Sequence, residues 1–375
     1  MKRRKGEGIQ NRAYKYRLYP TAEQKIFFAK NFGCCRFLYN RMLADKISYY
    51  EENQTMLKCT PAQYKKEFSW LKEADSLALA NVQLDLEQAY RSFFTQKKTG
   101  FPKFKSKKKS RQAYTTNLVN GNITVGEKGI RLPKAGMVRA VVHRRAPDHY
   151  TLKSITVSLE PSGEYYASLL YEYETDENQA VSEIQDMRIL GIDYAMHGLG
   201  VMSDGTRCEY PGYFRAASGR LAREQRKLSH CEKGSRNYEK QRKRVAACHQ
   251  KVKNQRKDYQ HKLSRRLAEA YDAIAIENLD MKAMSQCMNF GKSVMDNGYG
   301  QFVNMLEYKL KEKGGKLIRI DRFYPSSKKC SRCGKVKSEL KLSERIYRCE
   351  CGNEIDRDIN AAINIREEGR RLLSA

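Results

Sequence analysis

The C-terminal stretch CECGNEIDRDINAAINI, residues 349–365, joins two cysteines to two aspartates and to the start of an Ala-rich helix. Asp356 and Asp358 are two residues apart, so on a helix their side chains point about 200° apart and cannot serve one ion equally. Asp356 is placed to cap the N-terminus of the helix. We therefore expect one of these acids to have a structural role and the other to carry any chemistry.

The helix that follows has two candidate buried faces. One face carries Asp358 with Ala361, Ala362 and Ile365, whose small members would let the helix pack closely on a sheet. The other is the face of Ile359 and Ile363. Spacing alone does not choose between them.

The cysteines of this stretch form half of a metal-ligand pattern. CSRC at 330–333 and CEC at 349–351 are fifteen residues apart, and two such pairs can complete a tetrahedron around one ion. Thiolate ligands favour zinc, although iron can occupy such sites, and no exchangeable position is evident. A redox pair or four incidental thiols are the alternatives. The expected structural zinc ligands are Cys330, Cys333, Cys349 and Cys351.

The chain of 375 residues carries 72 Lys and Arg against 43 Asp and Glu, a formal net charge of +29. Self-repulsion of this size disfavours the compact state unless a polyanion neutralises it. Nucleic acid is the expected partner, because each neutralised phosphate releases condensed counterions. An anionic membrane is the alternative, but there is no long apolar run, so no membrane partner is expected.

The N-terminal residues 1–8 have the basic character of a secretory signal, but a polar segment follows where an apolar core should be. We therefore expect a prokaryotic-type cytoplasmic protein. In that compartment its eleven cysteines should not form disulfides.

Two basic segments are candidates for nucleic-acid contacts, although either could be a solvated surface. Segment 96–112 interleaves Phe101 and Phe104 with lysines, and such aromatics can stack on bases. Segment 214–266 has eighteen Lys and Arg against four acids at helical spacing, interrupted at Gly234, which favours phosphate binding by a helical hairpin. The candidate contacts are Lys97, Lys98, Phe101, Lys103, Phe104, Lys105, Lys107, Lys108, Arg226, Lys227, Arg242, Lys243, Arg244, Lys253, Arg256 and Lys257.

The N-terminal part of the chain is predicted to begin with a strand over 12–21. Thr21 and Gln24 fit a capping box for the helix that follows. Further helices are predicted from about Pro61 and over 77–94.

From residue 114 onward the pattern changes. Residues 114–173 form short β-rich runs, typical of a small antiparallel sheet or barrel, and the acidic segment 174–186 is a predicted linker. Residues 187–210 are predicted to be two strands joined by a turn. A buried strand over 271–280, a helix over 297–314 and a further strand follow.

Three acids lie at the ends of these C-terminal elements, namely Asp193, Glu277 and Asp358. A charge at the end of a buried strand is costly unless it is paired or binds a cation. Each acid could simply be paired with a neighbouring Arg or Lys. Together, however, a strand, a hairpin, a strand with an acid and a helix with an acid are the layout of an RNase H-like nuclease core. In such a core the carboxylates hold two Mg²⁺ ions, one activating the attacking water and one stabilising the leaving oxygen.

Several stretches together resemble the TnpB (OrfB) family of insertion-sequence transposons, compact RNA-guided DNA endonucleases related to type V CRISPR effectors. They are AYKYRLYP, FGCCRFLYNRML, GFPKFK, GID with SDG, IAIENL, FYPSSKKCSRCG and YRCECGNEIDRDINAAINI, and they span essentially the whole chain. The resemblance implies that Asp193, Glu277 and Asp358 are the catalytic, magnesium-binding carboxylates. It thereby selects Asp358 over Asp356. It also matches the four cysteines to the zinc ligands of the family.

The resemblance implies an α/β multidomain fold. It has an N-terminal β-barrel (wedge) interrupted by a helical recognition domain, and a C-terminal RNase H-like (RuvC) nuclease domain with an inserted zinc ribbon. The expected segments are 1–20 for the first wedge strand, 21–95 for the recognition domain, 96–180 for the rest of the barrel, 181–324 for the nuclease core with its basic arm at 214–266, 325–353 for the zinc ribbon, and 354–375 for the final helix.

By the same resemblance the protein is expected to be a monomeric ribonucleoprotein. It would hold a guide RNA from the transposon end, recognise a short transposon-adjacent motif and cut double-stranded DNA, with base pairing reading the target. The alternatives are a nuclease-inactive RNA-guided regulator, disfavoured because all three acids are present, and a transposase or transposase accessory protein.

The sequence departs from the family pattern at two places. Tyr299 stands where many members carry Trp, which we interpret as a packing change. Ser76, Ala80 and Leu84 stand where some members present polar, motif-reading side chains. The sequence of the adjacent motif is therefore not predicted.

Overall fold

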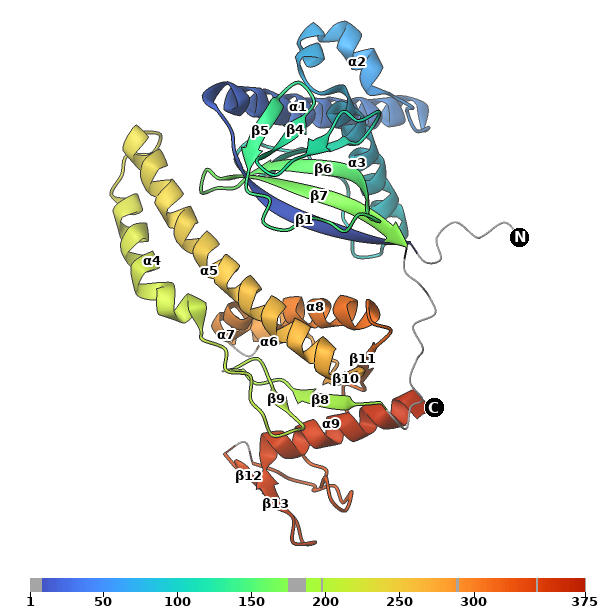
Figure 1. Cartoon of the computed structure of the whole chain (residues 1–375), viewed down its shortest axis with the longest axis vertical. Coiled ribbons are helices and arrows are strands. Elements are labelled where there is room, and N and C mark those ends of the chain that lie inside the picture. Colours follow the sequence, from blue (N-terminus) through green and yellow to red (C-terminus); the bar gives the residue numbers. More distant parts are fainter. Residues whose placement is uncertain (1–8, 175–186, 197, 288–289, 342, 375) are drawn as a thin grey trace, which may run out of the picture. The chain divides into compact units, whose positions relative to one another are not determined.

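The computed structural model describes residues 9–174 and 187–374, except for 197, 288–289 and 342. The chain divides into two units, Met1–Thr175 and Asp176–Ala375. This division falls in the predicted linker 174–186, which, like the N-terminal residues 1–8, lies almost entirely outside the described residues. Each unit has its own sheet and its own helices (Figure 1).

The first unit is built on a seven-stranded antiparallel sheet with the order β2-β6-β7-β1-β5-β4-β3. Its strands are β1 (Ile9–Tyr19), β2 (Gln112–Asn117), β3 (Thr124–Val125), β4 (Gly129–Leu132), β5 (Gly136–Ala140), β6 (Thr151–Leu159) and β7 (Tyr165–Glu174). The first strand pairs with the last, from Ile9 opposite Glu174 to Leu18 opposite Tyr165. The helices between β1 and β2 are therefore an insertion into the sheet, as predicted.

The inserted helices are α1 (Ala22–Asn53), α2 (Pro61–Glu67), the 3₁₀ helix η1 (Ser69–Glu73) and α3 (Ser76–Thr95). The predicted capping box is confirmed, since the Gln24 N–H donates to the Thr21 hydroxyl and the Thr21 N–H donates to the Gln24 side chain. The alternating buried residues of β1 and β7 face these helices, and Phe28 of α1 contacts the rings of Tyr114 and Tyr165. One continuous core thus joins the sheet to the inserted helices.

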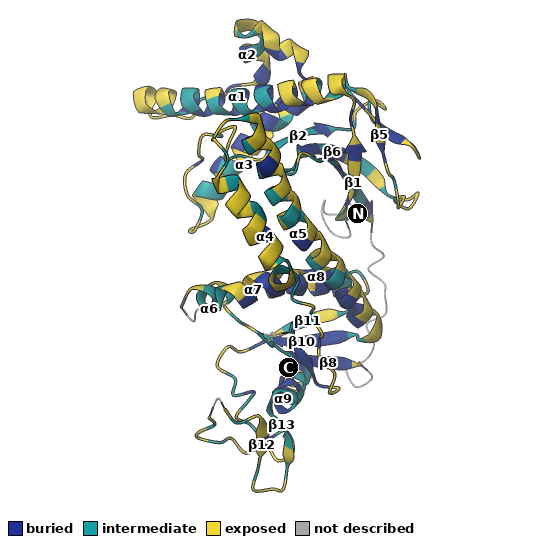
Figure 2. Ribbon diagram, turned by 90° about the vertical axis from the view of Figure 1, so that its left-hand side faces the viewer, coloured by how far each residue is buried: buried dark blue, intermediate teal, exposed yellow. Residues whose placement is uncertain are grey.

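The second unit contains a four-stranded sheet with the order β11-β10-β8-β9. Its strands are β8 (Ile189–Asp193), β9 (Val201–Met202), β10 (Ala273–Glu277) and β11 (Lys316–Ile320). β10 is parallel to β8 and β11, whereas β9 pairs antiparallel with β8. The predicted hairpin and the two later strands are confirmed, and the central strands are buried on both faces (Figure 2).

The remaining elements of this unit are six helices and a small ribbon within the described residues. They are α4 (Tyr213–Ser229), α5 (Arg236–Ala270), α6 (Met281–Cys287), α7 (Gly291–Asn297), α8 (Tyr299–Lys311), β12 (Ile346–Arg348), β13 (Glu354–Asp356) and α9 (Arg357–Ser374). α5 and α8 cover one face of the sheet, where Leu267 and Phe302 share a core with Ile274. α9 covers the other face (Figure 1).

Helix α9 lies against the sheet through small residues. Ala361 and Ala362 are buried, and Gly369 lies so close to β10 that a Cβ there would meet Ala275 at 2.5 Å. On β8, a Cβ at Gly191 would lie 2.0 Å from the Ala362 carbonyl oxygen. The helix face that carries Asp358 is therefore the one packed on the sheet, and the Ile359 face is not.

We expect Gly191→Ala to destabilise the second unit by at least about 2 kcal/mol, because its methyl group would collide with the backbone of α9 and separate helix from sheet. Thermal or urea unfolding measures the effect. Gly219→Ala in α4 is the matched control, since nothing lies within 4 Å of its Cβ position. The control should be neutral or stabilising by up to ~1 kcal/mol. Equal stability of the two variants would contradict the close approach of α9.

Candidate active site and metal centre

The register of two parallel strands brings Asp193 and Glu277 together. Ile192 pairs with Ile276, so the acids that follow them are neighbours at the carboxyl ends of β8 and β10. Side chains alternate along a strand, which puts Asp193 on the same face as Gly191 and Glu277 on the same face as Ala275. Both acids therefore lie on the face that α9 covers.

Asp358, in the first turn of α9, completes this group. The C-terminal end of α9 packs near the start of β8, where Leu373 contacts the cluster that contains Ile189, so its N-terminal end lies over the strand ends. Burial, together with the Glu277 and Asp358 carboxylates, raises the pKa of Asp193 well above its usual range, while Arg357 opposes the shift. The three carboxylates thus share one site in which their like charges repel.

A divalent cation would relieve this repulsion, and the donor set is of the oxygen type that Mg²⁺ prefers. Among the described residues, however, the three acids are not a group whose oxygens all lie within 4.8 Å of one another. Two of them also have a contact with another side chain. Ser326 donates to Glu277 at 2.7 Å, and Arg207 lies 3.5 Å from Asp358. The residue types and their convergence fit a metal site.

The structural role expected of Asp356 is confirmed. Its Oδ1 accepts the backbone N–H groups of Asp358 and Ile359 at 3.0 and 3.1 Å, which caps the N-terminus of α9. Its other oxygen pairs with Arg207 at 2.8 Å. Asp356 therefore positions the helix and holds the arginine that contacts Asp358.

The four predicted zinc ligands converge. Their Sγ atoms all lie within 4.8 Å of one another. Cys330 is 3.7 Å from Cys351, and Cys333 is 3.6 Å from Cys349. Sulfur atoms of a tetrahedral zinc site are separated by about 3.8 Å for a Zn–S bond near 2.3 Å. The cluster therefore fits a zinc ion.

Two matching knuckles present these thiols. Gly334 and Gly352 have φ of +78° and +81°, and their N–H groups donate to the carbonyls of Cys330 and Cys349. Burial raises the pKa of the Cys330 thiol, but hydrogen bonds from backbone N–H groups and the Asn353 amide outweigh it and lower this pKa to about 6. The low pKa favours the thiolate form, which is the form that binds metal. The ribbon continues to Asp356, three residues past its expected end, because β13 pairs with β12.

Two asparagines of α9 fasten this ribbon to the carboxylate site. Asn364 donates to the carbonyls of Ser326 and Lys329, and Asn360 donates to the same Lys329 carbonyl. Both asparagines are buried. Since Ser326 holds Glu277, the metal ribbon and the acid site share one hydrogen-bonded support. The spacing of these asparagines, four residues apart and so on one face of α9, was the signal that sequence reasoning missed.

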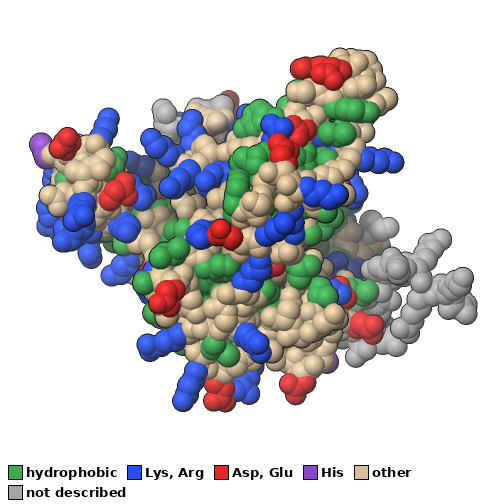
Figure 3. Space-filling view, turned by 90° about the horizontal axis from the view of Figure 1, so that it is seen from above, with side chains coloured by type: hydrophobic (Ala, Val, Ile, Leu, Met, Phe, Trp, Pro, Cys, Tyr) green, Lys and Arg blue, Asp and Glu red, His purple; other side chains and the backbone are tan. Residues whose placement is uncertain are grey.

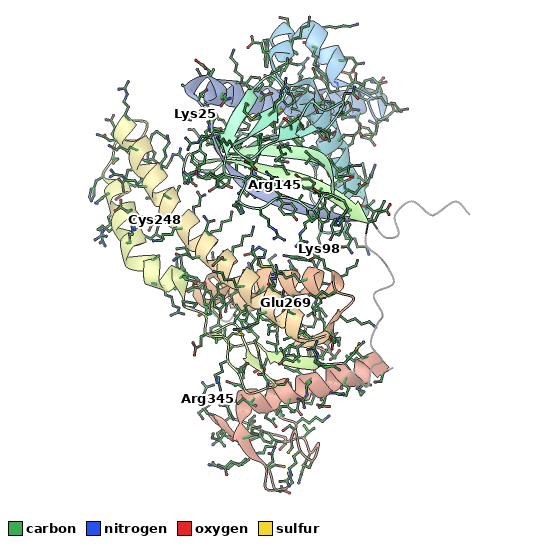
Figure 4. The ribbon with its side chains drawn as sticks, in the orientation of Figure 1. Lys25, Lys98, Arg145, Cys248, Glu269 and Arg345 are labelled. Atoms are coloured by element: carbon green, nitrogen blue, oxygen red, sulfur yellow. The ribbon has the colours of Figure 1, made fainter. Side chains whose placement is uncertain are left out.

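The basic segment between α3 and β2 lies on the surface of the first unit. Lys97, Lys98, Lys103, Lys107 and Lys108 are exposed, and Lys98 is labelled in Figure 4. Phe104 is 58 % exposed, and Phe101 is 44 % exposed although its ring also contacts the rings of Tyr90 and Phe93. Lys105 is also engaged, with its ammonium 3.8 Å from the centre of the Tyr39 ring. The face of α3 with Ala80 and Leu84 is exposed.

The second basic segment is a helical hairpin formed by α4 and α5, and the break is at Gly234, where φ is +93°. Lys and Arg side chains cover its outer end (Figure 3). Lys243, Arg244, Lys253, Lys257, Arg226 and Lys227 are exposed, and Arg242 is paired with Glu239. Arg256 donates to the carbonyls of Met295 and Asp296, so it also has a role in holding the hairpin to the core.

An unpredicted cap fixes the base of this hairpin. The buried carboxylate of Asp296 accepts the N–H groups of Phe214 and Arg215, in the first turn of α4, and the Tyr210 hydroxyl. The N-cap residue of α4, Gly212, has no side chain to cap the helix. Nearby Tyr299 is buried against Tyr194, as expected for a packing position.

Across the described residues, no helix is long and apolar enough to cross a membrane.

Three family models match the chain. Residues 299–365 match the Cas12f1-like TNB domain, residues 168–288 match a model described as a probable transposase, OrfB of IS605, and residues 10–55 match its helix-turn-helix domain. In this structure the last of these ranges is β1 followed by the single long helix α1.

Relatives are similar over nearly the whole chain. A protein of Streptomyces pristinaespiralis, named as a candidate RNA-guided DNA endonuclease, is 33 % identical over 96 % of this chain and 89 % of its own. InsQ of Escherichia coli K12, named likewise, is 29 % identical over 96 % and 93 %. A Cas12f1 structure, solved with its single guide RNA and target DNA, has a TM-score of 0.60 at 14 % identity, covering 96 % of this chain and 99 % of that one. That likeness shows the fold, in which an N-terminal sheet with inserted helices is followed along the chain by a second α/β domain. With full-length relatives at this identity, the chain belongs to the TnpB (OrfB) family.

Proposed function

We propose that this protein is a transposon-encoded, RNA-guided DNA endonuclease. The observation that carries the proposal is the convergence of Asp193, Glu277 and Asp358 at one end of the sheet, beside a ribbon with four metal-ligating cysteines. The names of its relatives point to the same activity.

The three carboxylates would hold Mg²⁺, which supplies an activated water and stabilises the leaving oxygen of the cut strand. The protein's own residues prepare that site. Ser326 orients Glu277, the Asp356 cap fixes the start of α9, and the positive end of the α9 dipole faces the acids. Arg207, exposed beside Asp358, can pair with a phosphate of the bound strand.

Guide RNA from the transposon end and double-stranded target DNA are the proposed partners of a monomeric ribonucleoprotein in the prokaryotic cytoplasm. The basic α4–α5 hairpin and the segment after α3 offer the positive charge that a nucleic-acid backbone needs. Base pairing would read the target, while the protein would read backbone shape and a short adjacent motif.

The test is to purify the protein, sequence the RNA bound to it, and add that RNA with a matching duplex and Mg²⁺. We expect a defined transposon-end transcript and cleavage only of the matching duplex. Random cellular RNA without guided cleavage would refute the proposal. Guided binding without cleavage would instead support the nuclease-inactive regulator.

The hairpin should contribute to RNA affinity through phosphate contacts. We expect the double variant Lys243→Ala/Lys253→Ala to reduce the slope of log affinity against log salt by about 1.4, or ~0.7 for each lost contact to single-stranded RNA. Filter binding at salt concentrations from about 50 to about 400 mM measures this slope. Lys262→Ala on the same helix is the control, because Lys262 is already paired with Asp258 at 2.7 Å. An unchanged slope in the double variant would exclude this face as an RNA contact.

A further inference from the structure

A hollow in the first unit is not explained by the acid site or the zinc ribbon. It has a volume of about 410 Å³ and lies between α1, α3, β2 and the residues from Lys105 to Arg111. This volume falls within the range of small-ligand pockets, roughly 300–1,000 Å³. All of its lining residues belong to the first unit.

One wall of the hollow carries an acid and a base that are close but not paired. Asp85 and Lys105 both line the hollow and form no ion pair with each other in the described structure. Each nevertheless changes the pKa of the other through its charge. The pKa of Asp85 is raised, because desolvation outweighs the opposing charge of Lys105. The pKa of Lys105 is lowered, because desolvation outweighs the opposing charge of Asp85. Asn40 clamps the backbone of Lys105 through two hydrogen bonds, which holds this arrangement in place.

The rest of the lining combines cationic and apolar side chains. Arg36 and Arg111 also line the hollow, and for neither does the described part of the chain provide an ion-pair partner. Phe32 and Val82 supply apolar walls. Tyr114, 4 % exposed, completes the lining, and its hydroxyl has no hydrogen-bond partner among the described residues. The hollow therefore offers a hydrogen-bond acceptor, a donor and apolar walls for a base, and two unpaired guanidinium groups for a phosphate.

We propose that this hollow binds one unstacked guanine nucleotide. The two carboxylate oxygens of Asp85 would accept the parallel N1–H and N2–H groups of guanine, and the Lys105 ammonium would donate to O6. Adenine and uracil each present one donor beside an acceptor on that edge, so they would leave a carboxylate oxygen unused. Arg36 and Arg111 would pair with the phosphate.

The inference rests on the proposed function, since the nucleotide comes from the guide RNA or from the target DNA. Photocrosslinking of the assembled complex separates these sources. In one arm the guide RNA carries 6-thioguanosine, and in the other the target DNA carries the deoxy analogue. Crosslinked peptides are then mapped by mass spectrometry. We expect peptides from α3 or from the segment 105–115 in one arm, and that arm identifies the strand.

Asp85→Asn should reduce this crosslink about tenfold, the size expected for losing one hydrogen bond to a charged group. Asp85 is solvent-accessible, so the variant should keep the melting temperature of the wild type. Glu87→Gln is the matched control, an exposed acid on the same helix that pairs with Gln83 and does not line the hollow. Its crosslink should be unchanged.

Several results would overturn the proposal. They are an absence of crosslinks to the hollow in both arms, equal yields in Asp85→Asn and wild type, or a stronger crosslink from 4-thiouridine than from 6-thioguanosine. Guided cleavage is assayed on the same samples. Guided cleavage without the crosslink would contradict the guanine site but leave the proposed function intact. The crosslink without guided cleavage would contradict the proposed function but leave the guanine site intact.

Discussion

Asp358→Asn is expected to slow guided DNA cleavage by more than about 10³-fold, a barrier increase of about 4 kcal/mol. The substitution keeps the shape of the side chain but removes one negative charge from the proposed metal site, where charge holds the cation. Binding of the guide RNA and of the target duplex should persist. Single-turnover cleavage and gel-shift assays on the same complex separate the two effects.

Asp356→Asn is the matched control, because it makes the same chemical change two residues away. Asparagine caps helices as well as aspartate does, and the exposed ion pair with Arg207 that would be lost is worth at most about 1 kcal/mol. Cleavage should therefore stay within about tenfold of wild type. A folded Asp356→Asn protein without activity, next to an active Asp358→Asn protein, would reverse the assignment of the two acids.

Asp193→Ala and Glu277→Ala should resemble Asp358→Asn, since all three acids are proposed to hold the same cations. Removal of Asp193 also relieves repulsion among the carboxylates, so this variant should fold at least as stably as wild type while it loses cleavage. Wild-type cleavage in any one of the three variants would remove that residue from the proposed site.

Cys330→Ser is expected to reduce bound zinc from about one ion per chain to none and to unfold the ribbon. Cys330 is the most buried of the four thiols, and the segment that follows Ser326 is tied to α9 by Asn360 and Asn364. Loss of the ribbon should therefore loosen the support of Glu277 and lower cleavage as well. Metal analysis and limited proteolysis measure the first effect, and the cleavage assay measures the second.

Cys248→Ser is the control for the loss of a thiol. Cys248 lies on α5 within the basic hairpin, away from the ribbon (Figure 4). Zinc content, protease resistance and cleavage should be unchanged in this variant. Full zinc content in the Cys330→Ser protein would contradict a structural zinc site. So would a wild-type melting temperature that is unchanged when a zinc chelator is added.

Local patterns predicted several elements of both units well. The alternation in β1, the Thr21 capping box and the break at Gly234 are each decided by residues near one another in the chain, and each was confirmed. The cysteine pairs were predictable for the same reason, since a short knuckle with a glycine needs only local geometry. The catalytic roles of the acids remain predictions that the variants above test.

Contacts between distant residues could not be predicted. The Asp296 cap of α4 joins residues about eighty positions apart, and Arg207 reaches acids about one hundred and fifty positions away. Lys105 lies over the Tyr39 ring, and Arg256 donates to the carbonyls of Met295 and Asp296. A charge count does not distinguish a lysine over a tyrosine ring from one in solvent.

For the opening stretch, the sequence by itself predicted that Asp356 caps the helix, because an aspartate just before a helix can accept the first backbone N–H groups. It also determined the metal-ligand pattern, because the spacing of the cysteines is local. Only the tertiary structure decided which face of α9 is buried. That choice depends on Gly191, whose missing side chain lets the Ala362 backbone touch β8 and so brings Asp358 over the ends of two strands. A helix carries its own periodicity, but the surface on which it packs is provided by residues far away in the chain.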